Sequence, residues 1–243
     1  MEIAGYCGHP AMAIILYKNV WPDPANLIER LEDALGESDH EFFCWKNATV
    51  GDMDQMLDYR DCSDFKMAEM ALPVTAEGFE DLGAIYTEYI TPVREAVHDH
   101  YSSLYNIKLE FEEATNFVRY TEGQHFALHP DHGFSYCAVT STIGWLNDDY
   151  EGGELVIPNM DIKFTPEAGD LMVFPSNYPY VHQSLPVENG VKYSAVTMYD
   201  YNDRNHQQPG ITCGDLPETI GGQIESASAR SLECRNDRQY SRI

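Results

Sequence analysis

Eight short strand-like segments follow one another between residues 113 and 201, and they constrain the fold of this 243-residue chain more than any other feature. Each is short, and turn signals such as Glu122-Gly123 and Glu188-Asn189-Gly190 separate them. Eight strands at this interval predict a jelly roll or barrel rather than βαβ units. The predicted strands are residues 117–120, 125–131, 138–146, 154–157, 162–165, 171–174, 181–185 and 193–199.

The preceding part of the chain mixes one strand with helices. Residues 13–17 form a short apolar, partly β-branched run that predicts a strand. Asp23 and Pro24 suit the N-cap and first turn of a helix that Gly36 ends. Thr75 suits the N-cap of a longer helix, whose apolar residues between 79 and 97 lie on one face. We therefore expect a mainly β protein with supporting α-helices.

Three zones follow from this pattern. Residues 1–112 provide an N-terminal strand and supporting helices of the same domain, and residues 113–201 provide the β core. Residues 202–243 form a polar C-terminal tail with few large aliphatic side chains. The acidic stretch from residue 41 to 72 predicts a surface loop or lid.

The formal net charge is −25, and residues 1–201 carry −24 of it. So acidic a body repels phosphate backbones, which argues against nucleic-acid partners. Solubility and attraction of a basic peptide are both explanations of the charge. No apolar stretch approaches the roughly 20 residues of a membrane span, and the first residues lack a basic signal-peptide region. The six scattered cysteines favour a reducing compartment, so we expect a cytoplasmic protein; the oligomeric state does not follow.

The predicted chemistry centres on His129-Pro130-Asp131, on His182 and on Lys192. Side chains two residues apart in a strand point the same way, so His129 and Asp131 can coordinate the same ion. With His182 from a distant strand they form two histidines and one carboxylate, the donor set that holds non-haem Fe(II) and leaves positions open. Lys192 then offers a positive charge near the metal for an anionic cosubstrate.

Two neighbouring histidines are weaker candidates. His125 would have to reach past four strand residues, and His132 alternates to the opposite face from Asp131. The Glu151-Gly-Gly-Glu154 stretch is better explained as a tight hairpin than as a phosphate cradle, because no helix follows it.

With these residues in place, an ordered series of blocks becomes legible between residues 113 and 200. The series resembles the 2-oxoglutarate and Fe(II)-dependent dioxygenases, in their prolyl 4-hydroxylase-like branch. In chain order the blocks are YTEGQ (120–124), the His-Pro-Asp motif, WLN (145–147), EGGEL (151–155), PEAGDLMVFPS (166–176), His182 and PVENGVKY (186–193).

The resemblance implies a double-stranded β-helix of the jelly-roll or cupin-like kind, with Fe(II) held by His129, Asp131 and His182. It implies that Lys192 pairs with the distal carboxylate of 2-oxoglutarate and that the Tyr120 hydroxyl reaches toward cosubstrate or substrate. Trp145 stands where many members have a tyrosine, and we expect it to form a wall of the same pocket. Oxygen is the second cosubstrate, and the resemblance leaves room for ascorbate.

The leading hypothesis is hydroxylation of a peptide or protein side chain, above all proline, with release of succinate and CO2. The same chemistry on a free amino acid, small metabolite or nucleobase is an alternative, and a catalytically silent jelly roll that binds a partner is another. The acidic segment from Asp52 to Asp64 predicts a mobile lid at the opening of the iron site. Its candidate substrate contacts are Tyr59 and Phe65.

Overall fold

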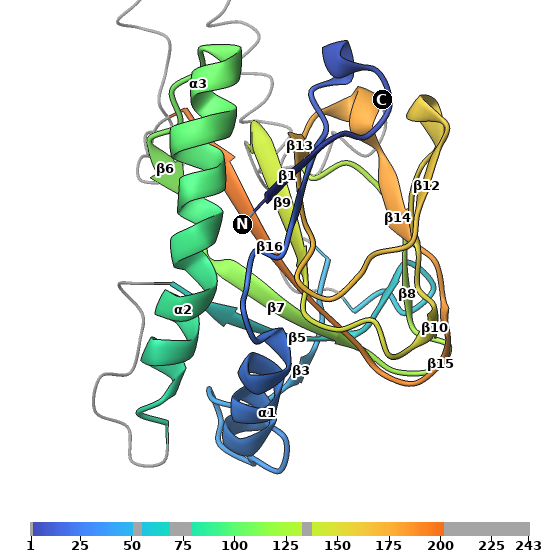
Figure 1. The fold of residues 1–243 in the computed structure, drawn as a ribbon. Helices are drawn as coiled ribbons and strands as arrows, with labels where there is room; N and C mark the ends of the chain where they lie inside the picture. The colour runs from blue at the N-terminus through green and yellow to red at the C-terminus, as the bar shows by residue number, and fades with distance from the viewer. Residues whose placement is uncertain (1, 51–54, 69–78, 133–137, 202–243) are drawn as a thin grey trace, which may run out of the picture.

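The computed structural model describes residues 2–50, 55–68, 79–132 and 138–201, and in these residues two antiparallel sheets face each other (Figure 1). The large sheet has the strand order β1-β2-β13-β9-β16-β7-β5-β3, with β6 also pairing with β16. Its strands are β1 (Glu2–Tyr6), β2 (Ile15–Lys18), β3 (Lys46–Asn47), β5 (Ser63–Met67), β6 (Phe111–Glu112), β7 (Thr115–Tyr120), β9 (Thr140–Trp145), β13 (Leu171–Pro175) and β16 (Lys192–Asp200).

The smaller sheet has the order β12-β11-β14-β8-β4, and a separate two-stranded ribbon joins β10 to β15. Its strands are β4 (Arg60–Asp61), β8 (His125–His129), β11 (Leu155–Ile157), β12 (Ile162–Phe164) and β14 (His182–Ser184), and the ribbon consists of β10 (Glu151–Gly152) and β15 (Val187–Asn189). All eight predicted strands are present. The arrangement is a double-stranded β-helix, and the prediction of a mainly β fold is confirmed.

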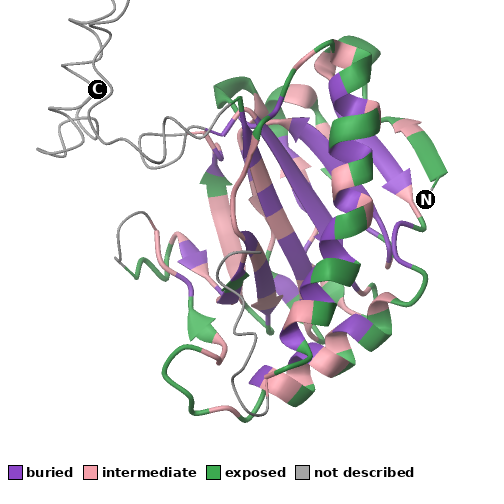
Figure 2. Ribbon diagram, turned by 90° about the vertical axis from the view of Figure 1, so that its left-hand side faces the viewer, coloured by how far each residue is buried: buried purple, intermediate pink, exposed green. Residues whose placement is uncertain are grey.

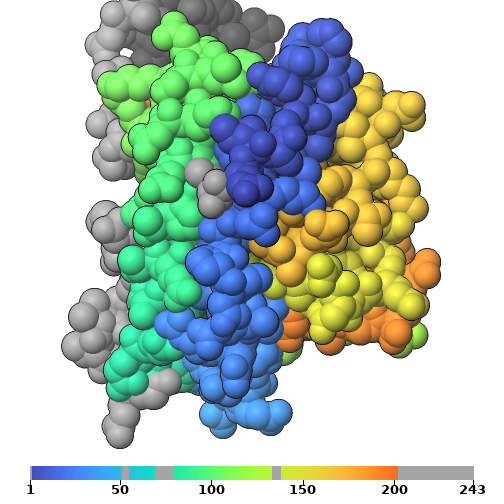
Figure 3. Space-filling model, viewed as in Figure 1, coloured from blue at the N-terminus to red at the C-terminus, as the bar shows by residue number. Residues whose placement is uncertain are grey.

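Helices cover the outer face of the large sheet (Figure 3). They are α1 (Pro24–Leu35), α2 (Leu82–Arg94), the π-helix η3 (Glu95–Tyr101) and α3 (Ser102–Tyr105). Helix α1 begins as predicted, because the Asp23 carboxylate accepts a hydrogen bond from the Asn26 amide. Thr75, the predicted cap of the second helix, lies outside the described residues.

The largest apolar core lies between these helices and the sheet, and a second fills the space between the two sheets. The helices expose their outer faces while the central strands are buried along most of their length (Figure 2). Every residue of β9 is buried, as expected for a strand covered on both faces. No described helix is long and apolar enough to cross a membrane.

The predicted loop or lid at residues 41–72 is where the structure differs most from the sequence prediction. The described part of this segment contributes β3, β4 and β5, which extend the two sheets. Phe65 on β5 is 7% exposed and belongs to the main core, so its prediction as a substrate contact is wrong. Residues 51–54 of the predicted lid and the whole tail 202–243 lie outside the described residues.

Candidate metal centre and adjoining cavity

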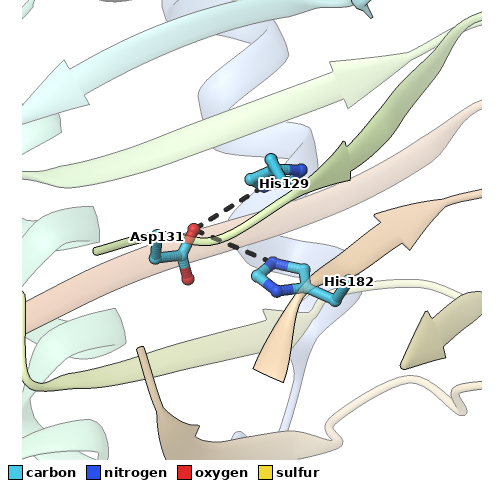
Figure 4. A group of neighbouring side chains, drawn as sticks. All are labelled: His129, Asp131 and His182. Atoms are coloured by element: carbon cyan, nitrogen blue, oxygen red, sulfur yellow. Dashed lines mark ion pairs between the residues drawn. The ribbon is translucent and has the colours of Figure 1, made fainter. Parts of the chain in front are cut away.

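His129, Asp131 and His182 come together between the two sheets. Strands β8 and β14 pair with His129 directly opposite His182, and Asp131 follows the end of β8. One ligand atom from each residue lies within 4.8 Å of the others. The Nε2 atoms of His129 and His182 lie 3.6 and 3.7 Å from Asp131 Oδ1, and the three side chains point toward one another (Figure 4).

The backbone fixes which nitrogen of each imidazole is free. His129 Nδ1 lies 2.7 Å from the Ala127 carbonyl oxygen, and His182 Nδ1 lies 3.0 Å from that of Tyr180. A carbonyl only accepts, so both Nδ1 atoms donate and both Nε2 lone pairs face Asp131. Burial, with the nearby His182, lowers the pKa of His129 to about 3. The ring is therefore neutral near pH 7, which is the form that binds metal.

Asp131 supplies the third oxygen donor. Its carboxylate is buried, and Oδ2 has no hydrogen-bond partner among the residues that the structure describes. A buried carboxylate without donors is costly unless a cation compensates its charge. Two imidazole nitrogens and one carboxylate on one side of an ion are the donor set of non-haem Fe(II) sites, so the residues present fit that metal.

A cavity of about 430 Å³ adjoins the three residues and lies between the sheets. Its size suits a small ligand together with one substrate side chain. Lys192 is in its wall, 3% exposed, and donates to the Gly153 carbonyl (2.6 Å) and the Ser184 hydroxyl (2.8 Å). Burial lowers the pKa of Lys192 to about 7. A buried ammonium with two neutral acceptors is a binding site for an anion.

Tyr120 and Trp145 line the same cavity as Lys192. The Lys192 ammonium lies 5.2 Å from the centre of the Tyr120 ring, a cation–π contact, whereas the Tyr120 hydroxyl interacts with the Cys62 thiol. Trp145 Nε1 is buried and has no partner within the described residues. Trp145 thus lines the cavity, in keeping with its prediction as a pocket wall.

Of the other candidate residues, one lines the cavity and two lie outside the metal cluster. Tyr59 lines the cavity, with its ring 6.4 Å from that of His129. His125 and His132 lie outside the three-residue cluster: His125 Nε2 is 3.4 Å from the Asp58 carbonyl oxygen, and His132 Nδ1 is 2.7 Å from that of Ala138.

Sequence reasoning missed several residues that line the cavity, among them Arg60, Phe126 and Ser184. Ser184 had a usable signal, because it follows His182 by two residues in one strand and so shares its face. Arg60 and Phe126 had no such sequence signal, because their positions at the cavity depend on how β4 pairs with β8.

Comparison with known proteins agrees with this geometry. The profile of the 2OG-Fe(II) oxygenase superfamily matches residues 115–200. Procollagen-lysine,2-oxoglutarate 5-dioxygenase 1 of Mus musculus is 29% identical over 115 residues, which cover 46% of this chain and 15% of that protein. A PKHD-type hydroxylase of Sphingopyxis alaskensis is 31% identical over 129 residues, covering 48% of this chain and 58% of that protein. The chain thus spans less than two thirds of the length of these curated relatives.

Solved structures share the fold at low sequence identity. A prolyl hydroxylase of Trichoplax adhaerens, in complex with a peptide of the hypoxia inducible factor oxygen degradation domain, superposes with a TM-score of 0.63 at 14% identity, covering 82% of this chain and 89% of that one. A Pseudomonas putida prolyl-4-hydroxylase gives 0.52 at 18% identity, covering 79% and 95%. The profile match covers the strands that carry the metal cluster, so residues 115–200 are similar to the 2OG-Fe(II) oxygenase superfamily, and the solved structures share the fold.

Proposed function

We propose that the protein is an Fe(II)- and 2-oxoglutarate-dependent oxygenase that hydroxylates a C–H group on a prolyl side chain of a peptide or protein. One observation carries the proposal: two imidazole Nε2 atoms and a carboxylate converge beside a cavity that contains a buried lysine. When bound, Fe(II), 2-oxoglutarate and O2 together convert a C–H to a C–OH and release succinate and CO2.

Each residue has a part in this assignment. His129, Asp131 and His182 hold the metal, and the backbone acceptors of the two histidines keep their Nε2 atoms turned toward it. Lys192 neutralises the distal carboxylate of the cosubstrate, with Ser184 orienting the ammonium, and Trp145 forms part of the wall of the same cavity. The apolar walls at Ile143 and Leu155 exclude water from the reacting groups.

The names of the related proteins support a peptide or protein substrate. Two of them are named as prolyl hydroxylases and one as a procollagen-lysine dioxygenase, and one of the prolyl hydroxylases is described in complex with a peptide. Ascorbate as an auxiliary reductant and a cytoplasmic location belong to the proposal as well, the latter because the three described cysteines are free thiols.

The proposal is tested by incubating the full chain with Fe(II), 2-oxoglutarate and O2 and measuring succinate release. The assay is run alone, with a panel of proline-containing peptides, and with free proline and other free amino acids, with and without ascorbate. We expect peptide-stimulated turnover and a mass increase of one oxygen on the peptide. Stimulation by a free amino acid alone would assign a small-molecule substrate instead, and no succinate under any condition would refute the function.

Asp131→Ala is the matched inactive variant. It removes one oxygen donor from the cluster, and Asp131 stands after the end of β8 rather than in an apolar core. We therefore expect succinate release to fall to the level without protein while the thermal unfolding midpoint changes little. Retained turnover would show that the metal is held elsewhere.

A further inference from the structure

Strand β8 carries a β-bulge next to the candidate metal ligands. His182 pairs with His129 and Ser184 pairs with Phe126, so two steps along β14 correspond to three along β8. In a regular strand, residues three apart would point to opposite faces. The extra residue turns both Phe126 and His129 into the cavity, and bulges of this kind serve to re-aim side chains next to active sites.

The two rings that the bulge brings together are stacked. The Phe126 and His129 ring centres lie 3.5 Å apart with an angle of 15° between their planes. The Ala127 carbonyl, inside the bulge, accepts from His129 Nδ1 at 2.7 Å. The imidazole is thus held by a face contact and by an edge contact, which together leave one direction for Nε2.

Arg60 covers the other face of Phe126. It is directly opposite Phe126 in the β4–β8 pairing, with its guanidinium carbon 5.0 Å from the ring centre. The guanidinium is itself fixed, because it donates to Asp64 Oδ2 (2.9 Å) and to the Thr49 carbonyl (2.8 Å). Arg60 is 9% exposed, so little solvent competes for these contacts.

The rim of the stack is closed by Tyr59. Its ring meets Phe126 edge-on, with centres 5.7 Å apart and planes at 82°. Phe126 is therefore confined on both faces and at one edge, and a confined ring transmits its own orientation to the imidazole that it touches.

We propose that Phe126, held in place by Arg60, is a positioning residue for the metal ligand His129 and that this three-layer stack sets the affinity of the site for a divalent metal. The inference rests on the ligand assignment of the proposed function. It assigns to Phe126 and Arg60 a role through His129 and not through contact with the metal. Groups that orient a ligand histidine from outside typically contribute roughly 10- to 100-fold to metal affinity.

The test is an anaerobic titration of the metal-free full chain with Co(II), followed through its visible d–d absorption. Phe126→Leu removes the flat ring but keeps an apolar side chain, and Phe126→Tyr keeps the ring. Phe43→Leu is the matched control, since Phe43 packs against the main core from outside, with its ring 4.8 Å from Phe79, and does not line the cavity. Thermal unfolding of each metal-free variant separates loss of folding from loss of metal binding.

We expect Phe126→Leu to weaken Co(II) binding roughly 10- to 100-fold and to change the absorption envelope, as loss of an orienting partner does. Phe126→Tyr should restore the parent dissociation constant, and Phe43→Leu should leave it unchanged. Arg60→Lys should weaken binding in the same direction, because a lysine keeps the charge but cannot lie flat on the ring. A parent dissociation constant and spectrum in Phe126→Leu would overturn the inference alone. A parent protein that binds no Co(II) would instead overturn the ligand assignment on which it rests.

Discussion

At the residue scale, Lys192 is the group whose environment most needs a ligand. It is 3% exposed, and burial lowers its pKa to about 7 although the charge of Glu154 acts in the opposite direction; its hydrogen-bond acceptors, the Gly153 carbonyl and the Ser184 hydroxyl, carry no charge. Its ammonium also faces the Tyr120 ring. These contacts orient the lysine without neutralising it, so a carboxylate bound in the cavity would find a preorganised partner.

Replacing Lys192 by methionine removes the charge and keeps the volume of the stem. Loss of a charge-assisted hydrogen bond of about 1.5–3 kcal/mol corresponds to roughly tenfold to hundredfold weaker cosubstrate binding. We expect the Michaelis constant for 2-oxoglutarate to rise by that factor while Co(II) affinity stays the same. Lys108→Met is the control, since Lys108 is an exposed lysine paired with Glu110 outside the cavity. An unchanged Michaelis constant in Lys192→Met would place the anion site elsewhere.

The pH dependence of cosubstrate binding follows from the same residue. The lysine of the empty cavity loses its proton as the pH rises through about 7, and a bound carboxylate favours the charged form and raises its pKa. Binding above pH 7 must then take up a proton, so the dissociation constant rises with pH, by at most about tenfold per unit for one proton. Calorimetry of the Co(II)-loaded protein at pH 8, in buffers of different ionisation enthalpy, should show uptake close to one proton. Lys192→Met should show none, and equal uptake by both proteins would assign the proton to another group.

The metal cluster could be predicted because two of its three residues belong to one short sequence motif. His129 and Asp131 are two residues apart, and the residue types themselves indicate the donor set. The stacking of Phe126 on His129 could not be predicted. It depends on a β-bulge, which is set by the pairing of β8 with β14 and has no recognisable sequence pattern.

At the scale of elements, β9 is a strand of the large sheet against which the helices pack closely at Gly144. It lies between β13 and β16 in the large sheet, and the helices pack against it. Gly144 gives room for this packing: a Cβ there would lie 2.4 Å from Trp21 Cη2 and 2.9 Å from the Tyr89 hydroxyl oxygen. Those two rings are stacked 4.9 Å apart at 10°, which leaves them little freedom to give way.

Gly144→Ala should therefore be overpacked and lower the free energy of unfolding by about 1–3 kcal/mol. For a domain of this size, each kcal/mol lowers the unfolding midpoint by roughly 2–4 °C. Trp21→Phe removes the ring atoms that the new methyl group meets, so the double variant should lose less stability than the sum of the two single variants. Thermal and urea unfolding of the four proteins measure this coupling, and strictly additive losses would contradict the packing argument.

The eight core strands were predictable because apolar runs and turn signals define them. The β4–β5 segment was not, and its side chains explain why. Asp64 and Lys66 on β5 face the cavity side, while Phe65 and Met67 enter the core under the helices. On the polar face of this strand Asp64 is buried and pairs with Arg60, whereas Lys66 is exposed. A tertiary ion pair of this kind makes a sheet strand look like an acidic loop in the sequence.

At the scale of the whole molecule, charge is distributed unequally between the body and the cavity. The chain has a net charge of −25, whereas Arg60, Lys66 and Lys192 line the cavity. Two acids, Glu113 and Asp131, also line the cavity, and Arg60 already pairs with Asp64, so Lys192 is the buried cation suited to hold the anionic cosubstrate. The body around it sets up a negative field that acts at long range on whatever approaches the mouth.

This field predicts a preference among peptide substrates. Two peptides share one central proline, and one carries flanking lysines while the other carries flanking glutamates. At an ionic strength of about 0.01 M, where the Debye length is roughly 30 Å, attraction should favour the basic peptide in kcat/KM by about tenfold or more. At about 0.15 M the length falls to roughly 8 Å, and the difference should shrink with it. The effect should appear in KM and in the association rate rather than in kcat, because steering acts before the substrate is seated.

A neutral peptide of the same length, insensitive to salt, controls for effects of ionic strength on the enzyme itself. Equal use of the acidic and basic peptides at low salt would show that the charge of the body serves solubility alone.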